Sequence, residues 1–253
     1  MGFIPDMTFF RENGYCVVPG LLDPAQCEAL RLLLTQAQAK ADRGEGEERW
    51  RQDGTAWEPA DGDGAARIVR RVPAPFEHSA VFRSIFGGDR VLDLVERFIG
   101  PRIYLHSSKM LYKPPFQGRR KPFHQDLAYW PDMTGAQVTI WCPIDPATAG
   151  NGCMEVVPGS HSRGMLEHHE LEDWQIEDGR IDPQSVRVIE MAAGDALFLD
   201  VLTIHASRPN RSDRGRLAAI VNYIAAPRAA GQHSRYGTTT PLRPAGLPAA
   251  AVG

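Results

Sequence analysis

The stretch HQDLAYWP at residues 124–131 decides which fold this chain is expected to form. On a β-strand, the side chains of residues i and i+2 lie on the same face. His124 and Asp126 are therefore expected to point together into a β-barrel, with Gln125 pointing away. An imidazole beside a carboxylate supplies two adjacent ligands for one metal ion.

A third ligand has to come from a distant strand that closes over the first. His205 is well placed, because it follows the apolar run Ala196-Leu197-Phe198-Leu199, which predicts a buried strand. Two histidines and one carboxylate form the facial triad of non-haem Fe(II), which leaves other coordination positions open. A second pattern of this kind, His168-His169-Glu170, lies in a polar run and predicts a solvated loop.

Arg216 indicates what the open positions could serve. It follows His205 by 11 residues (216 − 205 = 11) and begins a predicted strand. Its guanidinium could hold the far carboxylate of a dicarboxylic cosubstrate that chelates the same iron, since arginine binds carboxylates through two parallel hydrogen bonds. The nearby Arg208, Arg211 and Arg214 are expected to face solvent.

Length and composition are those of a soluble enzyme-sized domain. The chain has 253 residues, enough for one large domain with a sizeable core. Hydrophobic residues make up 43% and charged residues 23%, and the formal net charge of −3 argues against bulk nucleic-acid binding. No apolar run reaches the roughly 20 residues that span a bilayer, and residues 1–10 lack the basic region of a signal peptide.

The four cysteines indicate a reducing compartment. Cys16, Cys27, Cys142 and Cys153 show no CxxC spacing, and three of them sit in apolar runs. They are expected to be buried thiols rather than disulfides or metal ligands. A cytoplasmic location follows from this.

Hydrophobic periodicity and turn residues predict helices first and strands afterwards. The predicted N-terminal elements are a helix over 7–13, a strand over 15–18, a helix from 24 to about 41, a surface loop over 42–64 that carries Trp50 and Trp57, and a helix over 89–99. The predicted strands that follow are 102–112, 136–142, 153–157, 185–191, 196–201 and 216–225. Many short strands with regular turns predict a sandwich or barrel.

Several motifs in a fixed order carry a resemblance to a known family. They are Lys113-Pro114-Pro115, residues 124–131, Asn151-Gly152-Cys153-Met154 leading to Pro158-Gly159-Ser160-His161, and Gly194-Asp195 leading to His205-Ala206-Ser207, Asn210 and Arg216. With them the chain resembles the phytanoyl-CoA dioxygenase family of Fe(II)/2-oxoglutarate oxygenases, from the N-terminal strand to about Pro227. The resemblance implies a mainly β fold, the double-stranded β-helix or cupin-like jelly roll, with flanking N-terminal α-helices.

The resemblance also implies a domain organisation. One oxygenase domain is expected over 1–253, with a mostly helical flank at 1–100, the jelly-roll core at 101–226 and a loose tail or flap at 227–253. Segments 42–64, 162–184 and 227–253 could act as lids over the mouth of the site.

The family's site residues are carried over position by position. The resemblance implies that the metal ligands, which are also the catalytic residues, are His124, Asp126 and His205. It implies that the residues around 2-oxoglutarate are Arg216, Ser207, Trp141 and Lys109. The residues expected on the substrate side are Tyr129, Trp130 and Arg71. The implied cofactors are Fe(II), 2-oxoglutarate and O2 as cosubstrate. Because Asp126 is present where related halogenating enzymes carry a small residue, hydroxylation or a related oxidation is favoured.

The substrate is expected to be a small organic molecule of natural-product or secondary metabolism. An unactivated C–H would be oxidised, with release of succinate and CO2. The alternative is an acyl-CoA α-hydroxylase, for which the basic turn at 117–121 could hold the CoA phosphates. A third alternative is a metal-binding or ligand-binding jelly roll without redox chemistry, and Arg216 with Ser207 argues against it, because a zinc hydrolase needs no clamp for 2-oxoglutarate.

Overall fold

The structure, a computed structural model, describes most of the chain. The described residues are 4–43, 57–59, 67–117, 119–225, 233–234, 237–238 and 240–243. Two segments expected to act as lids, 42–64 with Trp50 and 227–253, lie largely outside them. No described helix is long and apolar enough to cross a membrane.

The N-terminal elements agree with the sequence prediction. They are α1 (Met7–Asn13), β1 (Tyr15–Val18) and α2 (Pro24–Asp42). α1 begins where the Asp6 carboxylate accepts hydrogen bonds from two backbone N–H groups, and it ends at Gly14, whose φ of 77° is left-handed. α2 begins with a reciprocal capping box between Asp23 and Gln26. The predicted elements over 7–13, 15–18 and 24–41 are therefore confirmed.

Three further helices precede the main strands. They are α4 (Pro75–His78), α5 (Ala80–Phe86) and α6 (Asp89–Ile99). The sequence predicted only α6, because α4 and α5 are too short for a helical period to stand out. α5 is stabilised by the Ser79 hydroxyl, which caps its first turn, and by burial of Phe82 and Phe86.

The larger sheet contains seven antiparallel strands. Their order is β1-β12-β7-β14-β5-β17, with β4 also paired to β5. Their bounds, beyond β1, are β4 (Arg71–Pro73), β5 (Ile103–Lys113), β7 (Gln137–Pro143), β12 (Ala196–Asp200), β14 (Arg216–Ala225) and β17 (Thr240–Arg243). Since β1 pairs with β12 and β4 with β5, residues 1–100 give two strands to this sheet and are more than the helical flank that was expected.

The smaller sheet has four antiparallel strands in the order β11-β8-β13-β6. They are β6 (Lys121–His124), β8 (Met154–Val156), β11 (Arg187–Ile189) and β13 (His205–Ser207). Each of the six strands predicted after residue 101 is found, as β5, β7, β8, β11, β12 and β14. β6 and β13 pair so that His124 lies opposite His205, which brings two distant histidines together by register.

The remaining described elements are short. They are the 3₁₀-helices η1 (Asp126–Tyr129), η2 (Ser160–Arg163), η3 (Asp178–Arg180) and η4 (Pro183–Ser185), and the strand pairs β2 (Trp57–Pro59) with β3 (Arg67–Val69), β9 (His169–Glu170) with β10 (Trp174–Gln175), and β15 (His233–Ser234) with β16 (Gly237–Thr238).

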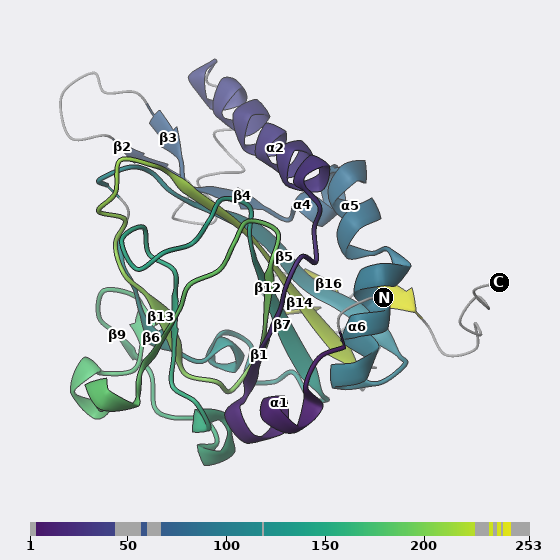
Figure 1. The fold of residues 1–253 in the computed structure, drawn as a ribbon, viewed down its shortest axis with the longest axis vertical. Helices are drawn as coiled ribbons and strands as arrows, with labels where there is room; N and C mark the ends of the chain where they lie inside the picture. The colour runs from purple at the N-terminus through teal and green to yellow at the C-terminus, as the bar shows by residue number, and fades with distance from the viewer. Residues whose placement is uncertain are drawn as a thin grey trace.

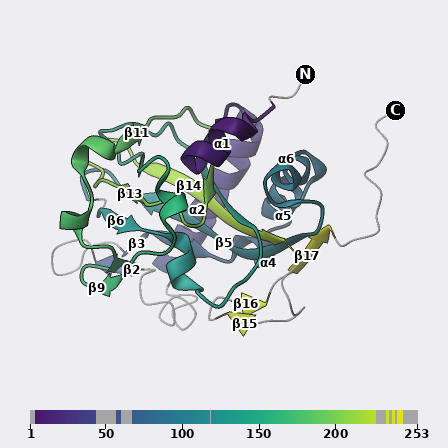
Figure 2. The same ribbon diagram turned by 90° about the horizontal axis from the view of Figure 1, so that it is seen from below.

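Two apolar layers hold the molecule together. One packs the helices on the outer face of the larger sheet and includes Phe82, Val95 and Met110. The other includes Trp141 of β7 and Val156 of β8, and so joins the inner faces of the two sheets. Figures 1 and 2 show α5 and α6 on one side of β5 and β14, and β6 and β13 on the other. The expected jelly roll with flanking helices is confirmed, with the predicted site residues on its inner faces.

Candidate active site

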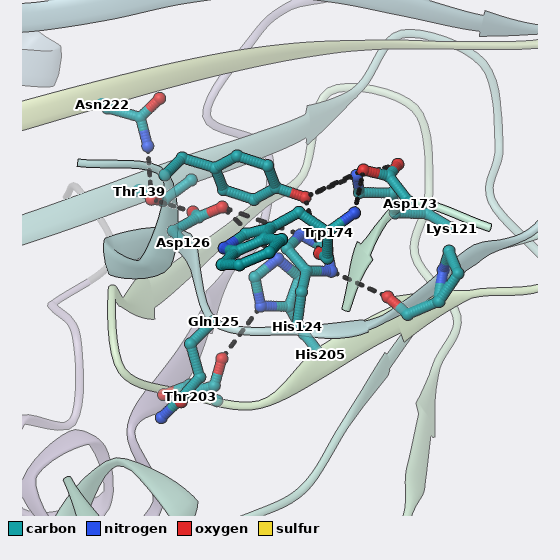
Figure 3. A network of polar contacts seen from close by, with 12 residues as sticks. Lys121, His124, Gln125, Asp126, Thr139, Asp173, Trp174, Thr203, His205 and Asn222 are labelled. Carbon is teal, nitrogen blue, oxygen red and sulfur yellow. Dashed lines mark hydrogen bonds and ion pairs between the residues drawn. The ribbon is translucent and has the colours of Figure 1, made fainter. Parts of the chain in front are cut away.

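The three predicted metal ligands lie together between the two sheets. His124 and His205 each turn Nε2 toward the same oxygen of Asp126, at 3.8 Å and 3.7 Å from Oδ1. All three side chains are buried, and their ligand atoms lie within 4.8 Å of one another (Figure 3). This spacing allows one ion to bind all three, and the set of two imidazoles and one carboxylate suits Fe(II).

Both histidines are oriented by backbone carbonyl groups. Nδ1 of His124 lies 2.8 Å from the carbonyl oxygen of Pro122, and Nδ1 of His205 lies 2.9 Å from that of Thr203. A proton on Nδ1 donates in each pair, which leaves Nε2 as the free ligand atom. Burial, and then the charge of His205, lower the pKa of His124 well below its usual range, so its imidazole stays neutral as a ligand must.

Asp126 is oriented by a chain of three hydrogen bonds that crosses the larger sheet. Its Oδ2 accepts from the Thr139 hydroxyl at 2.5 Å. Thr139 in turn accepts from the Asn222 side-chain amide at 2.6 Å, and Asn222 accepts from the Ser107 hydroxyl at 2.7 Å. Because Oδ2 is occupied in this way, Oδ1 is the oxygen available to a metal.

The expected strand geometry of the motif needs one correction. β6 ends at His124, and Asp126 begins the 3₁₀-helix η1 rather than continuing the strand. Gln125 between them keeps an extended backbone (φ −115°, ψ 135°), so the two ligands still share a face. The fully buried Gln125 side chain donates to the carbonyl groups of Gly164 and Leu202.

The predicted cosubstrate arginine is buried, and part of its guanidinium has no hydrogen-bond partner among the described residues. Arg216 begins β14 on the inner face, with 2% of its surface exposed, and its guanidinium carbon lies 5.2 Å from the ring centre of Trp141. Nε and Nη1 of Arg216 have no hydrogen-bond partner among the described residues. Burial lowers its pKa to about 10, so it remains charged at neutral pH. A buried cation with unused N–H groups fits a carboxylate as its partner.

Ser207 lies on β13 and is held by a lysine. The Lys113 amine donates to Ser207 Oγ at 2.7 Å, and Lys113 lies directly opposite Arg216 in the pairing of β5 with β14. The expected members of the cosubstrate site, Arg216, Ser207 and Trp141, are therefore all buried on the inner faces.

Two cations are found on the β4–β5 side of the centre. Lys109 lies on the inner face of β5 opposite Ile220, and burial lowers its pKa to about 8, while the charge of Asp126 opposes this shift. Arg71 on β4 pairs with Leu111 and so shares that face. Nε of Arg71 is buried without a hydrogen-bond partner among the described residues.

Tyr129 and Trp130 occupy different positions. The Tyr129 ring lies edge-on to His124, with 5.7 Å between ring centres. Trp130 packs in an apolar cluster, and its indole N–H donates to Gln137 at 2.9 Å, so it acts mainly as a packing residue. Trp130 also lies edge-on to His106, which is buried with both ring nitrogens lacking hydrogen-bond partners in the described part of the chain. Burial lowers the pKa of His106 to about 4.

The segment expected to be a lid is attached to the metal motif. Asp173 forms an ion pair with Lys121 of β6, and Lys121 also donates to the Tyr129 hydroxyl at 2.7 Å (Figure 3). His168, predicted to lie in a solvated loop, is buried, and its Nε2 accepts from the Gln125 backbone N–H at 3.0 Å. His168 of the second histidine pattern therefore helps to hold the backbone of the first pattern at Gln125. Among the described residues, only His124, Asp126 and His205 have metal-ligand spacing.

Several site residues were missed from the sequence. Thr139 could have been found by strand alternation, because it lies two residues before Trp141 on the same face of β7. Lys113 belongs to the Lys113-Pro114-Pro115 motif, but its sequence context did not indicate a role. For His106 and Asn222 no sequence signal existed, since their meaning depends on the pairing of β5 with β14.

Comparison with known proteins agrees with the geometry. The sequence profile of the family described as phytanoyl-CoA dioxygenase (PhyH) matches residues 10–218. A probable alpha-ketoglutarate-dependent hypophosphite dioxygenase of Stutzerimonas stutzeri is 29% identical over 63% of this chain and 58% of its own length. The peroxisomal phytanoyl-CoA dioxygenase of Rattus norvegicus is 28% identical over 85% of this chain and 66% of its own. The match thus spans less than two thirds of either relative.

Solved structures share the fold. EvdO2 from Micromonospora carbonacea var. aurantiaca, crystallised with 2-oxoglutarate, superposes with a TM-score of 0.66 at 22% identity. The alignment covers 93% of this chain and 96% of that protein. At this identity the likeness speaks for the jelly roll alone.

Proposed function

Since this chain belongs to the phytanoyl-CoA dioxygenase family, we propose that it is an Fe(II)/2-oxoglutarate-dependent dioxygenase that hydroxylates, or otherwise oxidises, an unactivated C–H of a small organic substrate. The observation that carries the proposal is the pairing of two buried features. A His124–Asp126–His205 cluster with metal-ligand spacing lies in the same inter-sheet space as Arg216, whose buried Nε and Nη1 find no hydrogen-bond partner in the described part of the chain.

Each cofactor has residues that fit it. His124, Asp126 and His205 would bind the iron. Arg216 and Ser207 would hold the far carboxylate of 2-oxoglutarate, with Trp141 and Lys109 at its sides. The bound pair would supply activation of O2, so that one oxygen atom enters the substrate and the other enters succinate, with release of CO2.

The chain itself contributes orientation and exclusion of water. The carbonyl groups of Pro122 and Thr203 fix the two imidazole rings, and Thr139 fixes the carboxylate. Burial of these groups keeps bulk water away from the reacting atoms and strengthens the ionic contacts at the site.

A small substrate is favoured over an acyl-CoA. Two of the three cations in the basic turn that was a candidate for the CoA phosphates are already paired, Arg120 with Glu172 and Asp178, and Lys121 with Asp173. Phosphates would have to displace these carboxylates. A molecule of natural-product or secondary metabolism remains the proposed substrate, approaching the side lined by Tyr129, Lys109 and Arg71.

A metal site without redox chemistry is the second candidate. Two histidines and an aspartate also suit zinc. Arg216 distinguishes the two, since zinc hydrolysis gives no reason to bury a cation beside the metal with unused donors.

The proposal also covers organisation and location. We take the chain to be one oxygenase domain, with 162–184 as a closing element anchored by Asp173. A cytoplasmic location is proposed because Cys16, Cys27, Cys142 and Cys153 are all free and buried.

The test is an anaerobic titration of the apoprotein with Fe(II) and 2-oxoglutarate, followed by visible absorption. Chelation of iron by the 2-oxo acid gives a weak metal-to-ligand charge-transfer band. We expect the band in the unmodified protein and in the exposed control Arg214→Ala, and its loss in Arg216→Ala at the same 2-oxoglutarate concentration. A folded, iron-loaded protein without the band would exclude the dioxygenase assignment and favour the zinc or ligand-binding reading.

A further inference from the structure

Lys113 is a buried lysine that the proposed chemistry does not use. It ends β5 with 9% of its surface exposed. Its amine donates to three oxygen atoms: Ser207 Oγ at 2.7 Å, the Ser207 carbonyl at 3.3 Å, and the Arg208 carbonyl. Three acceptors match the three N–H donors of an ammonium group.

The surrounding chain is shaped to admit this amine. Gly152 has a φ of +83°, and a Cβ there would lie 3.1 Å from Cδ and 3.2 Å from Nζ of Lys113. The same Cβ would lie 2.3 Å from the Arg208 carbonyl, so only glycine fits. The Asn210 side chain donates to the Lys113 carbonyl at 3.0 Å, which fixes the backbone at the same point. The motifs at 113–115, 151–154 and 205–210 thus converge on one amine.

The contact with Ser207 determines what its hydroxyl can do. A serine hydroxyl has one hydrogen to donate and can accept from other groups. When Lys113 is protonated, the amine has no lone pair and Ser207 Oγ can only accept from it, so the hydrogen of Ser207 is left for another acceptor. Lys113 is opposite Arg216 in the strand register, so the free hydroxyl hydrogen and the unpartnered guanidinium belong to the same end of the two sheets.

The charges around Lys113 also favour an anion at this place. Burial, and then the positive charge of Arg216, lower the pKa of Lys113 to about 6. Cys153 and Glu155 oppose this shift, and they complete the titratable groups that act on the amine. A carboxylate held by Arg216 would add negative charge nearby and raise the pKa of Lys113, so its binding would draw a proton onto the amine.

We propose that Lys113 is a positioning residue for the cosubstrate: by donating to Ser207 Oγ, it directs the Ser207 hydroxyl hydrogen to the far carboxylate of the 2-oxo acid that Arg216 binds. The inference rests on the proposed function, and it adds to that function a residue that acts through another residue rather than on the cosubstrate itself.

The test measures binding rather than turnover. Iron-loaded protein without O2 is titrated with 2-oxoglutarate and, separately, with 2-oxobutyrate, which has the same chelating group but no far carboxylate. Lys113→Met should raise the Kd for 2-oxoglutarate about tenfold, the value of one hydrogen bond to a charged group. The Kd for 2-oxobutyrate should stay within about twofold. Lys40→Met, an exposed lysine of α2, is the matched control and should change neither.

The same lysine substitution in a Ser207→Ala variant shows whether Lys113 acts through Ser207 or merely supports the fold. In Ser207→Ala, the further change Lys113→Met should weaken 2-oxoglutarate binding clearly less than it does when Ser207 is present, because the hydroxyl through which Lys113 acts is gone and only the attraction of its charge remains. Equal weakening for both acids, a full effect in the Ser207→Ala background, or an unchanged Kd in Lys113→Met would each overturn the inference. Absence of the charge-transfer band in unmodified protein would instead contradict the proposed function.

The unmodified protein gives an independent measurement if Lys113→Met does not fold. Calorimetry at neutral pH in two buffers of different ionisation enthalpy counts the protons taken up on binding. Uptake of part of a proton with 2-oxoglutarate and none with 2-oxobutyrate supports the inference. Equal proton counts for the two acids would overturn it.

Discussion

Asp126 divides its two carboxylate oxygens between two tasks, because Thr139 donates to Oδ2 at 2.5 Å while Oδ1 faces both histidines. Thr139 is itself held by Asn222. The metal-binding oxygen is therefore selected by a strand of the opposite sheet, and the two sheets have to be packed correctly before the metal site is complete.

Removing this hydroxyl should weaken iron binding. Thr139→Val keeps the shape of the side chain but leaves Oδ2 without its donor and the Asp126 carboxylate free to rotate. Loss of a hydrogen bond that orients a metal ligand costs about 10- to 100-fold in affinity. The Kd for Fe(II) without O2 measures the effect. Thr139→Ser retains the hydroxyl and should bind iron like the unmodified protein; equal Kd values for all three would contradict the role of Thr139.

The buried guanidinium of Arg216 should lower the stability of the folded protein when the cosubstrate is absent. A buried cation with unpartnered N–H groups is unfavourable. Without 2-oxoglutarate, Arg216→Met is therefore expected to have a Tm equal to or above that of the unmodified protein. In iron-loaded protein, adding 2-oxoglutarate at 100 times its Kd should raise the Tm of the unmodified protein, a stabilisation of about 2.7 kcal/mol, and should leave the Tm of iron-loaded Arg216→Met almost unchanged. A lower Tm for the apo variant would show that Arg216 supports the fold.

Gln125 should matter for the fold and not for metal ligation. Its side chain donates to the carbonyl groups of Gly164 and Leu202 and accepts from the Leu166 N–H. Gln125→Leu leaves these three partly buried groups without their partner, at about 1 kcal/mol for each. Urea denaturation should show a loss of about 3 kcal/mol, and Gln125→Glu, which places a buried carboxylate against two carbonyl oxygens, should lose at least as much. Unchanged stability of Gln125→Leu would mean that other contacts hold Gly164 and Leu166 in place.

The ion pair between Asp173 and Lys121 should make part of the stability depend on acid. Burial raises the pKa of Asp173, but the charge and hydrogen bond of Lys121 outweigh it, and the net pKa lies below the usual 3.8. A depressed carboxyl pKa contributes stability above the unfolded-state value, and this is lost as the pH falls through the folded-state value.

The contribution of the Asp173–Lys121 ion pair is tested by measuring Tm as a function of pH. Between pH of about 5 and 3, the Tm of the unmodified protein should fall more steeply than that of Asp173→Asn, which has no proton to take up. Glu170→Gln changes an exposed acid of the same segment and should follow the unmodified protein. Parallel curves for all three would show that the pair does not hold this segment in place.

Much of the fold could be predicted from local pattern. The strands after residue 101 either alternate polar and apolar residues or form apolar runs between turn residues. Both patterns can be read from the sequence, because each depends only on residues that are neighbours in the chain. α5 could not be predicted, since its stability comes from burying Phe82 and Phe86 against other elements. The sequence correctly predicted that His124 and Asp126 lie on the same face, but it assumed a continuous strand. The strand ends at His124, and the extended backbone of Gln125 keeps the two side chains on one face.

The sequence by itself determined which chemical groups were available and roughly how far apart along the chain they lay. It singled out two histidines, an aspartate and an arginine through types and spacings that suit iron and a carboxylate, and the family resemblance added a serine. Only the tertiary structure decided which side chains act on those groups. Thr139 reaches Asp126, and Lys113 reaches Ser207, because packing the two sheets brings together residues that are far apart in the chain. Such contacts depend on strand register and sheet packing, and no local sequence pattern encodes them.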